Sequence, residues 1–172
     1  MNPIIWREGV CDPHAHVFNN KVYMYTTHDC PDGSDGFRMT DWQIWSSEDL
    51  INWKLERTIR PEEFYCGSLD QCWAVDVAYK DGTYYWYFST GDWGVGAATG
   101  RQPGGPFTDA LGKPLVDFST EPAGIPKWDP CVFQDDDGSA YLIVGDCRSE
   151  PYNAYKVGGQ AVLGRQLGAT TP

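Results

Sequence analysis

The chain contains three copies of one pattern, and this repeat limits the folds that it can adopt. Each copy has an acidic residue, a short apolar run, a turn and a second run rich in aromatic residues. The copies span residues 12–29, 73–92 and 128–146. Their turn dipeptides are Asn19-Asn20, Asp81-Gly82 and Asp137-Gly138, all of which tolerate positive φ. Such turns suit tight β-hairpins, so the sequence predicts three hairpins that are each led by a carboxylate.

The spacing of the repeat indicates a β-propeller. Its interval is somewhat longer than one four-stranded blade of the common propellers, which fits a propeller with insertions. Residues 42–59 and 95–99 supply further strands, and the proline-containing residues 102–116 close a blade at an edge. We therefore expect an all-β fold, a partial β-propeller of about two and a half to three four-stranded blades. Residues 1–172 form one domain in this interpretation.

The pattern fades after the third hairpin. A further strand is expected at residues 153–157. Residues 158–172 are rich in glycine and carry no repeat, so we expect a weakly patterned tail there.

The charge balance narrows the class of partner. The chain has 13 Lys and Arg against 24 Asp and Glu, a formal net charge of −11. This argues against nucleic acid and against an anionic membrane surface, and it is compatible with a neutral substrate such as a sugar. The N-terminal residues lack a basic region followed by an apolar stretch, and no run of apolar residues is long enough to span a bilayer. We expect a cytoplasmic protein as the sequence is written, or a secreted one if a leader has been removed.

Cysteine and histidine spacing gives no sign of a metal or cofactor. The six cysteines form no CxxC pair, so we expect free thiols, with Cys66–Cys72 as the only pair close in sequence. His14 and His16 alternate on one face of a strand, but no third ligand stands at a recognisable spacing. The acidic run 135–137 has the composition of a calcium loop, yet Gly138 and the flanking strands favour a hairpin tip. We expect no cofactor.

Several motifs together resemble glycoside hydrolase family 43, the five-bladed β-propeller arabinofuranosidases, xylosidases and arabinanases. The resemblance runs from about residue 2 to about residue 156, with the motifs in the family's order. They are Asp12-Pro13, residues 46–53 (SSEDLINW), residues 73–77 (WAVDV), residues 104–116 (GGPFTDALGKPLV) and residues 128–142 (WDPCVFQDDDGSAYL).

The resemblance implies two catalytic residues and an inverting mechanism. Asp12 matches the general base that activates water, and Asp129 matches the carboxylate that orients the general acid and raises its pKa. The family's general acid is a Glu that would fall past residue 172. The activity implied is hydrolysis of arabinose or xylose linkages in plant polysaccharides. The alternatives are a non-catalytic sugar-binding half-propeller that lacks the acid, and an inert truncated chain.

Four further residues are candidates for substrate binding. Trp73 and Trp128 match pocket aromatics of the family, and aromatic faces cover the C–H faces of sugars well. The alternative for both is a place in the blade core. His28 ends the second strand of the first hairpin near the expected pocket rim, or it faces solvent or a carbonyl as an ordinary strand-end histidine. Asp76 stands closer to its turn than Asp12 and Asp129 do to theirs, so it either lines the pocket or holds the blade together.

An open ring of two and a half blades predicts self-association. Aromatic residues that the next blade would cover, such as Trp45, Trp86 and Tyr87, would form a large apolar patch in water. We therefore expect a homo-oligomer, a dimer or higher, that completes the propeller around a carbohydrate substrate.

Overall fold

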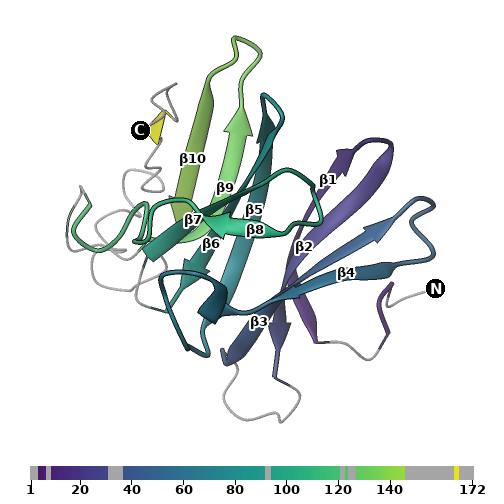
Figure 1. The fold of residues 1–172 in the computed structure, drawn as a ribbon, viewed down its shortest axis with the longest axis horizontal. Coiled ribbons are helices and arrows are strands. Elements are labelled where there is room, and N and C mark those ends of the chain that lie inside the picture. Colours follow the sequence, from purple (N-terminus) through teal and green to yellow (C-terminus); the bar gives the residue numbers. More distant parts are fainter. Residues whose placement is uncertain are drawn as a thin grey trace, which may run out of the picture.

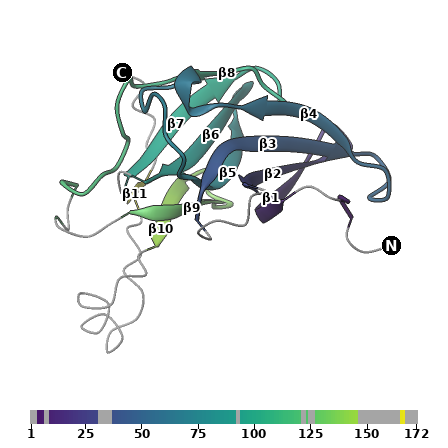
Figure 2. The same cartoon turned by 90° about the horizontal axis from the view of Figure 1, so that it is seen from below.

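The expected all-β partial propeller is confirmed. The computed structural model describes residues 4–6, 9–30, 37–91, 94–120, 123 and 127–145, together with the backbone of residues 165–166. Within these ranges, three antiparallel sheets are arranged side by side like the blades of a fan (Figures 1 and 2). Each sheet is a blade, and the blades follow one another in chain order.

The first two blades each have four strands in sequential order. The strands of blade 1 are β1 (Val10–Phe18), β2 (Lys21–Asp29), β3 (Met39–Ser47) and β4 (Lys54–Ile59). A short 3-10 helix, η1 (Pro61–Glu63), leads to blade 2. The strands of blade 2 are β5 (Cys72–Lys80), β6 (Thr83–Thr90), β7 (Gly94–Gly100) and β8 (Phe107–Asp109). The short β8 lies at the sheet edge, as the prolines around it predict.

Blade 3 contains β9 (Trp128–Gln134) and β10 (Ala140–Gly145), to which the two-residue β11 (Arg165–Gln166) is added. The order in this sheet is β11-β10-β9. Residues 153–157, where a further strand was expected, lie outside the described residues. The strand β11 falls within residues 158–172, the expected tail. The outer limits of the domain remain a prediction.

The hairpin turns follow the expected chemistry in two cases of three. Asn19 and Asn20 have φ of 53° and 61°, and Asp81 and Gly82 have φ of 51° and 79°, so both turns place two residues in the left-handed region. The third connection is longer than the expected dipeptide. It runs over residues 135–139, is closed by a hydrogen bond from Asp135 N–H to the Ser139 carbonyl, and uses positive φ only at Gly138 (86°).

A cluster of aromatic rings joins blade 1 to blade 2. Trp42 and Trp86 are fully buried and meet edge to face, with ring centroids 5.4 Å apart. Phe64 and Phe88 stack on each other in the same cluster at 4.8 Å. These rings remove a large apolar area from water at the junction between the two blades.

A smaller apolar cluster joins blade 2 to blade 3. Tyr87 and Val95 of blade 2, together with Val116 after β8, pack against Leu142 and Val144 of β10. Since neighbouring residues of a strand point to opposite faces, Trp86 reaches blade 1 while Tyr87 reaches blade 3.

The expectation that Trp45, Trp86 and Tyr87 need a second copy to cover them is wrong. Their exposed fractions are 8%, 0% and 4% within the single chain. The neighbouring blades of the same chain already cover Trp86 and Tyr87, because both faces of blade 2 are packed. Self-association therefore has no support from these three residues.

The cysteines that the structure describes are thiols, as expected. Cys66 donates a hydrogen bond to the Pro61 carbonyl instead of forming a disulfide with Cys72, which is buried. No helix in the described ranges has the length and apolar character that crossing a membrane would require.

Candidate functional site

One β-bulge recurs at the start of the innermost strand of every blade. The strand β5 contacts both β1 and β9, so these three strands lie next to one another across the blades. The pairing register slips by one residue between Cys11 and His14 in β1, between Cys72 and Val75 in β5, and at the matching place in β9. A bulge of this kind re-aims the side chain that it carries.

The bulges place Asp12 and Asp129 in the same position of two blades. Each is the first residue of its bulge and each is followed by proline. Both have positive φ, 47° for Asp12 and 52° for Asp129, a conformation that costs energy for any residue with a side chain. Both side chains are exposed. Two exposed carboxylates held in the same strained conformation are a typical sign of function.

The two carboxyl groups are close enough to interact. Burial of the surrounding site raises the pKa of Asp129, and the negative charge of Asp12 raises it further. The charge of His14 acts in the opposite direction on the same pKa. The N–H of Asp129 donates a 2.8 Å hydrogen bond to the Ser89 hydroxyl of β6, which fixes the bulge of blade 3 to blade 2.

Blade 2 carries a tryptophan where blades 1 and 3 carry an aspartate. The register places Trp73 in the bulge of β5, at the position of Asp12 and Asp129, whereas Asp76 comes three residues later. Trp73 is half-buried and meets the buried Trp128 edge to face, with ring centroids 5.0 Å apart. The Trp73 indole N–H donates to the Phe37 carbonyl at 3.0 Å. The two tryptophans thus form one aromatic pair that includes a bulge position, and their contact with a sugar stays a prediction.

Asp76 is buried and connects three blades. Its Oδ1 lies 2.6 Å from His16 Nε2 and 3.0 Å from His14 Nδ1, both on β1. Its Oδ2 accepts a 2.7 Å hydrogen bond from the Val132 N–H of β9. Asp76 is 1% exposed and joins blade 2 to both neighbouring blades, a role that differs from holding its own blade together. Its contact with a substrate stays a prediction.

Hydrogen bonds between Asp76 and the two histidines shift the pKa values of Asp76 and His14. Burial alone would raise the pKa of Asp76, but the bonds from His14, His16 and Val132 hold it well below its usual range. The bond to Asp76 in turn raises the pKa of His14, against the effect of burial. Sequence spacing did not reveal Asp76, a third side chain of metal-binding type, beside His14 and His16, because it comes from the neighbouring blade.

His28 lies at the end of β2, as expected, and bonds to a carboxylate. Its Nδ1 is 2.8 Å from Oδ1 of Asp41 on β3, and both side chains are partly buried. The register of the hairpin, which pairs His28 with Asp41, brings them together. Sequence reasoning missed Asp41 because the pairing of β2 with β3 depends on the length of the loop between them.

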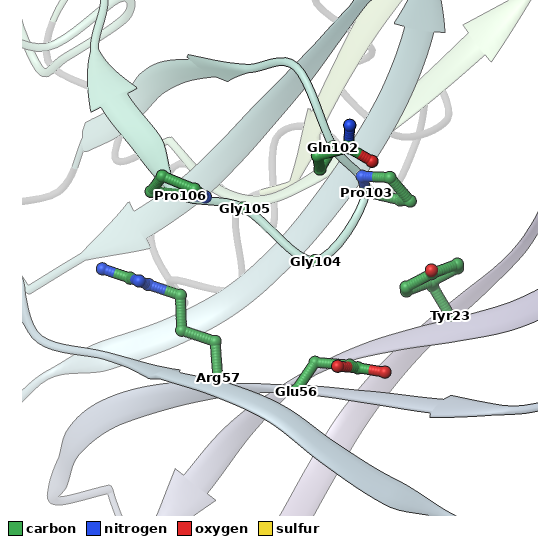
Figure 3. Close-up of a pocket in the computed structure, with 8 residues that line it drawn as sticks. All are labelled: Tyr23, Glu56, Arg57, Gln102, Pro103, Gly104, Gly105 and Pro106. Carbon is green, nitrogen blue, oxygen red and sulfur yellow. The ribbon is translucent and has the colours of Figure 1, made fainter.

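A polar cleft of about 350 Å³ lies elsewhere on the molecule (Figure 3). It is formed by β4 and the turn before β8, and its lining includes Glu56, Arg57 and Gln102. None of the residues predicted for catalysis or substrate binding lines it. The strained carboxylates, and not this cleft, define the candidate site.

Antiparallel blades placed side by side, with carboxylates on their innermost strands, are the architecture of the propeller-fold glycoside hydrolases. The chain belongs to one family of that class, the glycosyl hydrolases family 43, whose family model matches residues 1–162. The resemblance read from the sequence is thereby confirmed.

Relatives with known names agree with this assignment. The chain is 36% identical over 174 residues to xylosidase/arabinosidase 43A of Humicola insolens, covering 92% of this chain and 50% of that protein. It is 32% identical to an arabinoxylan arabinofuranohydrolase of Paenibacillus polymyxa, covering 84% and 26%. The chain spans half the length or less of the curated relatives that it matches.

The chain likewise covers only about half of the solved structures that it resembles. A GH43 β-xylosidase/α-arabinofuranosidase from a compost microbial metagenome, solved with xylotriose in a calcium-free form, superposes with a TM-score of 0.71 at 31% identity. This match covers 84% of the present chain and 45% of the other. An α-L-arabinofuranosidase of Clostridium thermocellum gives a TM-score of 0.64 at 33% identity, covering 84% and 50%.

The raised pKa of Asp129 predicts that Asp129→Asn stabilises the fold at neutral pH. Below pH 3.8 the wild-type carboxyl is protonated in both the folded and the unfolded chain, so the two proteins should have equal stability. As pH rises through the folded pKa, the wild type must keep a charge beside Asp12, and it loses stability that the amide retains. Thermal unfolding at pH 7 should show a Tm higher by up to about 4 °C for the variant, since a partly exposed charge is screened.

A difference in Tm that is the same at pH 3 and pH 7 would contradict this account. Asp136→Asn, at the exposed tip of the third hairpin, is the matched control and should leave the Tm unchanged at both pH values.

Proposed function

We propose that this chain carries the general base and the acid-orienting carboxylate of an inverting family 43 glycoside hydrolase. The observation that carries the proposal is the pair Asp12 and Asp129, two exposed aspartates with positive φ at equivalent bulges whose charges interact. Strain of this kind persists where the surrounding structure over-determines a conformation that function requires.

In the proposed mechanism Asp12 accepts a proton from a water molecule as that water attacks the anomeric carbon of the sugar. The bond to the leaving oxygen breaks on the opposite face, and a carboxylic acid donates the proton that the leaving oxygen needs. Asp129 orients that acid and holds its pKa high by like charge. The Trp73 and Trp128 pair offers aromatic surface to the C–H faces of the sugar.

The general acid is assigned to the remaining part of the family fold. This part of the proposal is supported by the length of the relatives, which are at least twice as long as the part that this chain matches. The substrates proposed are xylosides and arabinofuranosides, because the matched relatives are named xylosidases, arabinosidases and arabinofuranohydrolases.

The role of Asp12 can be tested without the acid. A 2,4-dinitrophenyl β-xyloside or α-arabinofuranoside releases an acidic phenol that needs no protonation, so its hydrolysis depends on the base. We expect Asp12→Asn to lower kcat/KM by about 10²–10⁴-fold, because an amide cannot take the proton from water. Release of dinitrophenol by the purified 172-residue chain is the measurement, with Asp136→Asn as control.

Equal turnover by the wild type and Asp12→Asn would contradict the role of Asp12. Proton NMR of the first sugar formed distinguishes inversion from retention of the anomeric configuration, and retention would overturn the proposed mechanism. A wild type without turnover that binds xylotriose would favour the alternative, a sugar-binding half-propeller.

We also propose that two or more copies associate through blade 3. The rings of Phe133 and Tyr141 stack on each other there with centroids 6.4 Å apart, and Phe133 is 51% exposed. Light scattering should give a multiple of 19.3 kDa for the wild type and a lower mass for Phe133→Ser. The control is Val17→Ser on β1, an apolar position that is 69% exposed, and it should leave the mass unchanged. A mass of 19.3 kDa for the wild type at micromolar concentration would contradict association.

A further inference from the structure

Three side chains that the proposed hydrolysis does not use converge between blade 1 and blade 2. His14 and His16 are alternate residues of β1, so their imidazoles lie on one face of the strand, and β5 brings Asp76 up to that face. One ligand atom from each of the three lies within 4.8 Å of the other two. The atoms in closest approach are His14 Nδ1, His16 Nε2 and Asp76 Oδ1.

We propose that His14, His16 and Asp76 form a binding site for a divalent transition metal of the Zn²⁺ class. Two imidazoles and one carboxylate on one side of an ion are a donor set that suits Zn²⁺, Fe²⁺ and their neighbours, and that leaves positions for water or another ligand. Ca²⁺ and Mg²⁺ prefer sets made of oxygen alone. The chemistry of the donors therefore selects the metal class.

The surroundings of the three donors are those of a supported site. Asp76 is buried and its second oxygen is fixed by the Val132 N–H, as the outer partners of metal ligands usually are. The ring of His16 stacks on Phe18 with centroids 5.8 Å apart, which limits its orientation. The two imidazoles are about one-third exposed, 33% for His14 and 32% for His16, so an ion can reach them from solvent.

Charge and geometry agree with this assignment. The negative charges of Asp12 and Asp129 both act on His14, so a dication there would sit in a favourable potential. The metal would take the place of the protons now shared between the imidazoles and Asp76. Donor atoms around tetrahedral Zn²⁺ are about 3.3 Å apart, so the separations of 2.6 and 3.0 Å from Asp76 Oδ1 need to widen by less than 1 Å. The two imidazole nitrogens lie within 4.8 Å of each other and need to reach the same spacing.

The test is metal binding by the full 172-residue chain after treatment with a chelator and dialysis. Titration calorimetry with Zn²⁺ should give one ion per chain with a dissociation constant of about 10 µM or tighter. Co²⁺, a visible-absorbing substitute for Zn²⁺, should develop the absorption of a site with nitrogen ligands. His14→Gln and His16→Gln should each weaken binding by at least about 100-fold.

His28→Gln is the matched control, because the His28 imidazole pairs with Asp41 outside the three-residue cluster. It should bind Zn²⁺ as the wild type does. If a variant at position 14 or 16 does not fold, histidine NMR of the wild type decides: Zn²⁺ should shift the ring signals of His14 and His16 and leave those of His28 in place. No Zn²⁺ binding by the wild type, equal binding by all variants, or Ca²⁺ binding as tight as Zn²⁺ binding would each overturn the proposal.

Discussion

The buried carboxylate of Asp76 is the interaction on which the arrangement of the blades depends. It belongs to β5 in blade 2, and it bonds to two imidazoles of blade 1 and one backbone N–H of blade 3. Apolar packing holds neighbouring blades together in pairs, whereas the Asp76 side chain bonds to the blades on both sides of its own. A buried charge is costly unless it is fully bonded, and each oxygen of this one has its partners. The carboxylate therefore helps to fix the relative position of the innermost strands, on which the bulges and the strained aspartates lie.

This arrangement links stability to the proposed chemistry. Asp12 and Asp129 lie in bulges and are exposed to solvent. Asp76 lies beyond the bulge of blade 2 and is buried. Exposed carboxylates with positive φ cost stability, and the raised pKa of Asp129 shows that its charge is unfavourable in the fold. The buried carboxylate has the opposite shift, because His14 and His16 stabilise its charge. The three aspartates of the repeat thus fall into two environments. The charge is unfavourable at Asp129 in its bulge and favourable at Asp76 outside the bulge.

Much of the fold could be predicted from the sequence because hairpin turns are local. Asn19-Asn20 and Asp81-Gly82 fix where strands reverse, and the apolar runs on either side form the strands. The position of Asp12 and Asp129 followed from the shared Asp-Pro context. The contacts between blades could not be read in the same way. The pairing of Asp76 with His14 and His16 and the burial of Trp86 and Tyr87 depend on how strands of different blades meet, and alternation within one strand does not reveal that. The place of Trp73 in a bulge depends on a slip in register between β5 and β6, which the turn residues do not show.

The most direct test of the role of Asp76 is hydrogen exchange of the backbone amides in Asp76→Asn, compared with the wild type under native conditions. The amide keeps the shape of the side chain but replaces one acceptor oxygen by an NH2 donor, so it cannot accept both from the imidazoles and from the Val132 N–H as the carboxylate does. The account predicts faster exchange in β1, β5 and β9 together, with the Val132 amide among those affected. Faster exchange confined to β5, with β1 and β9 unchanged, would contradict it.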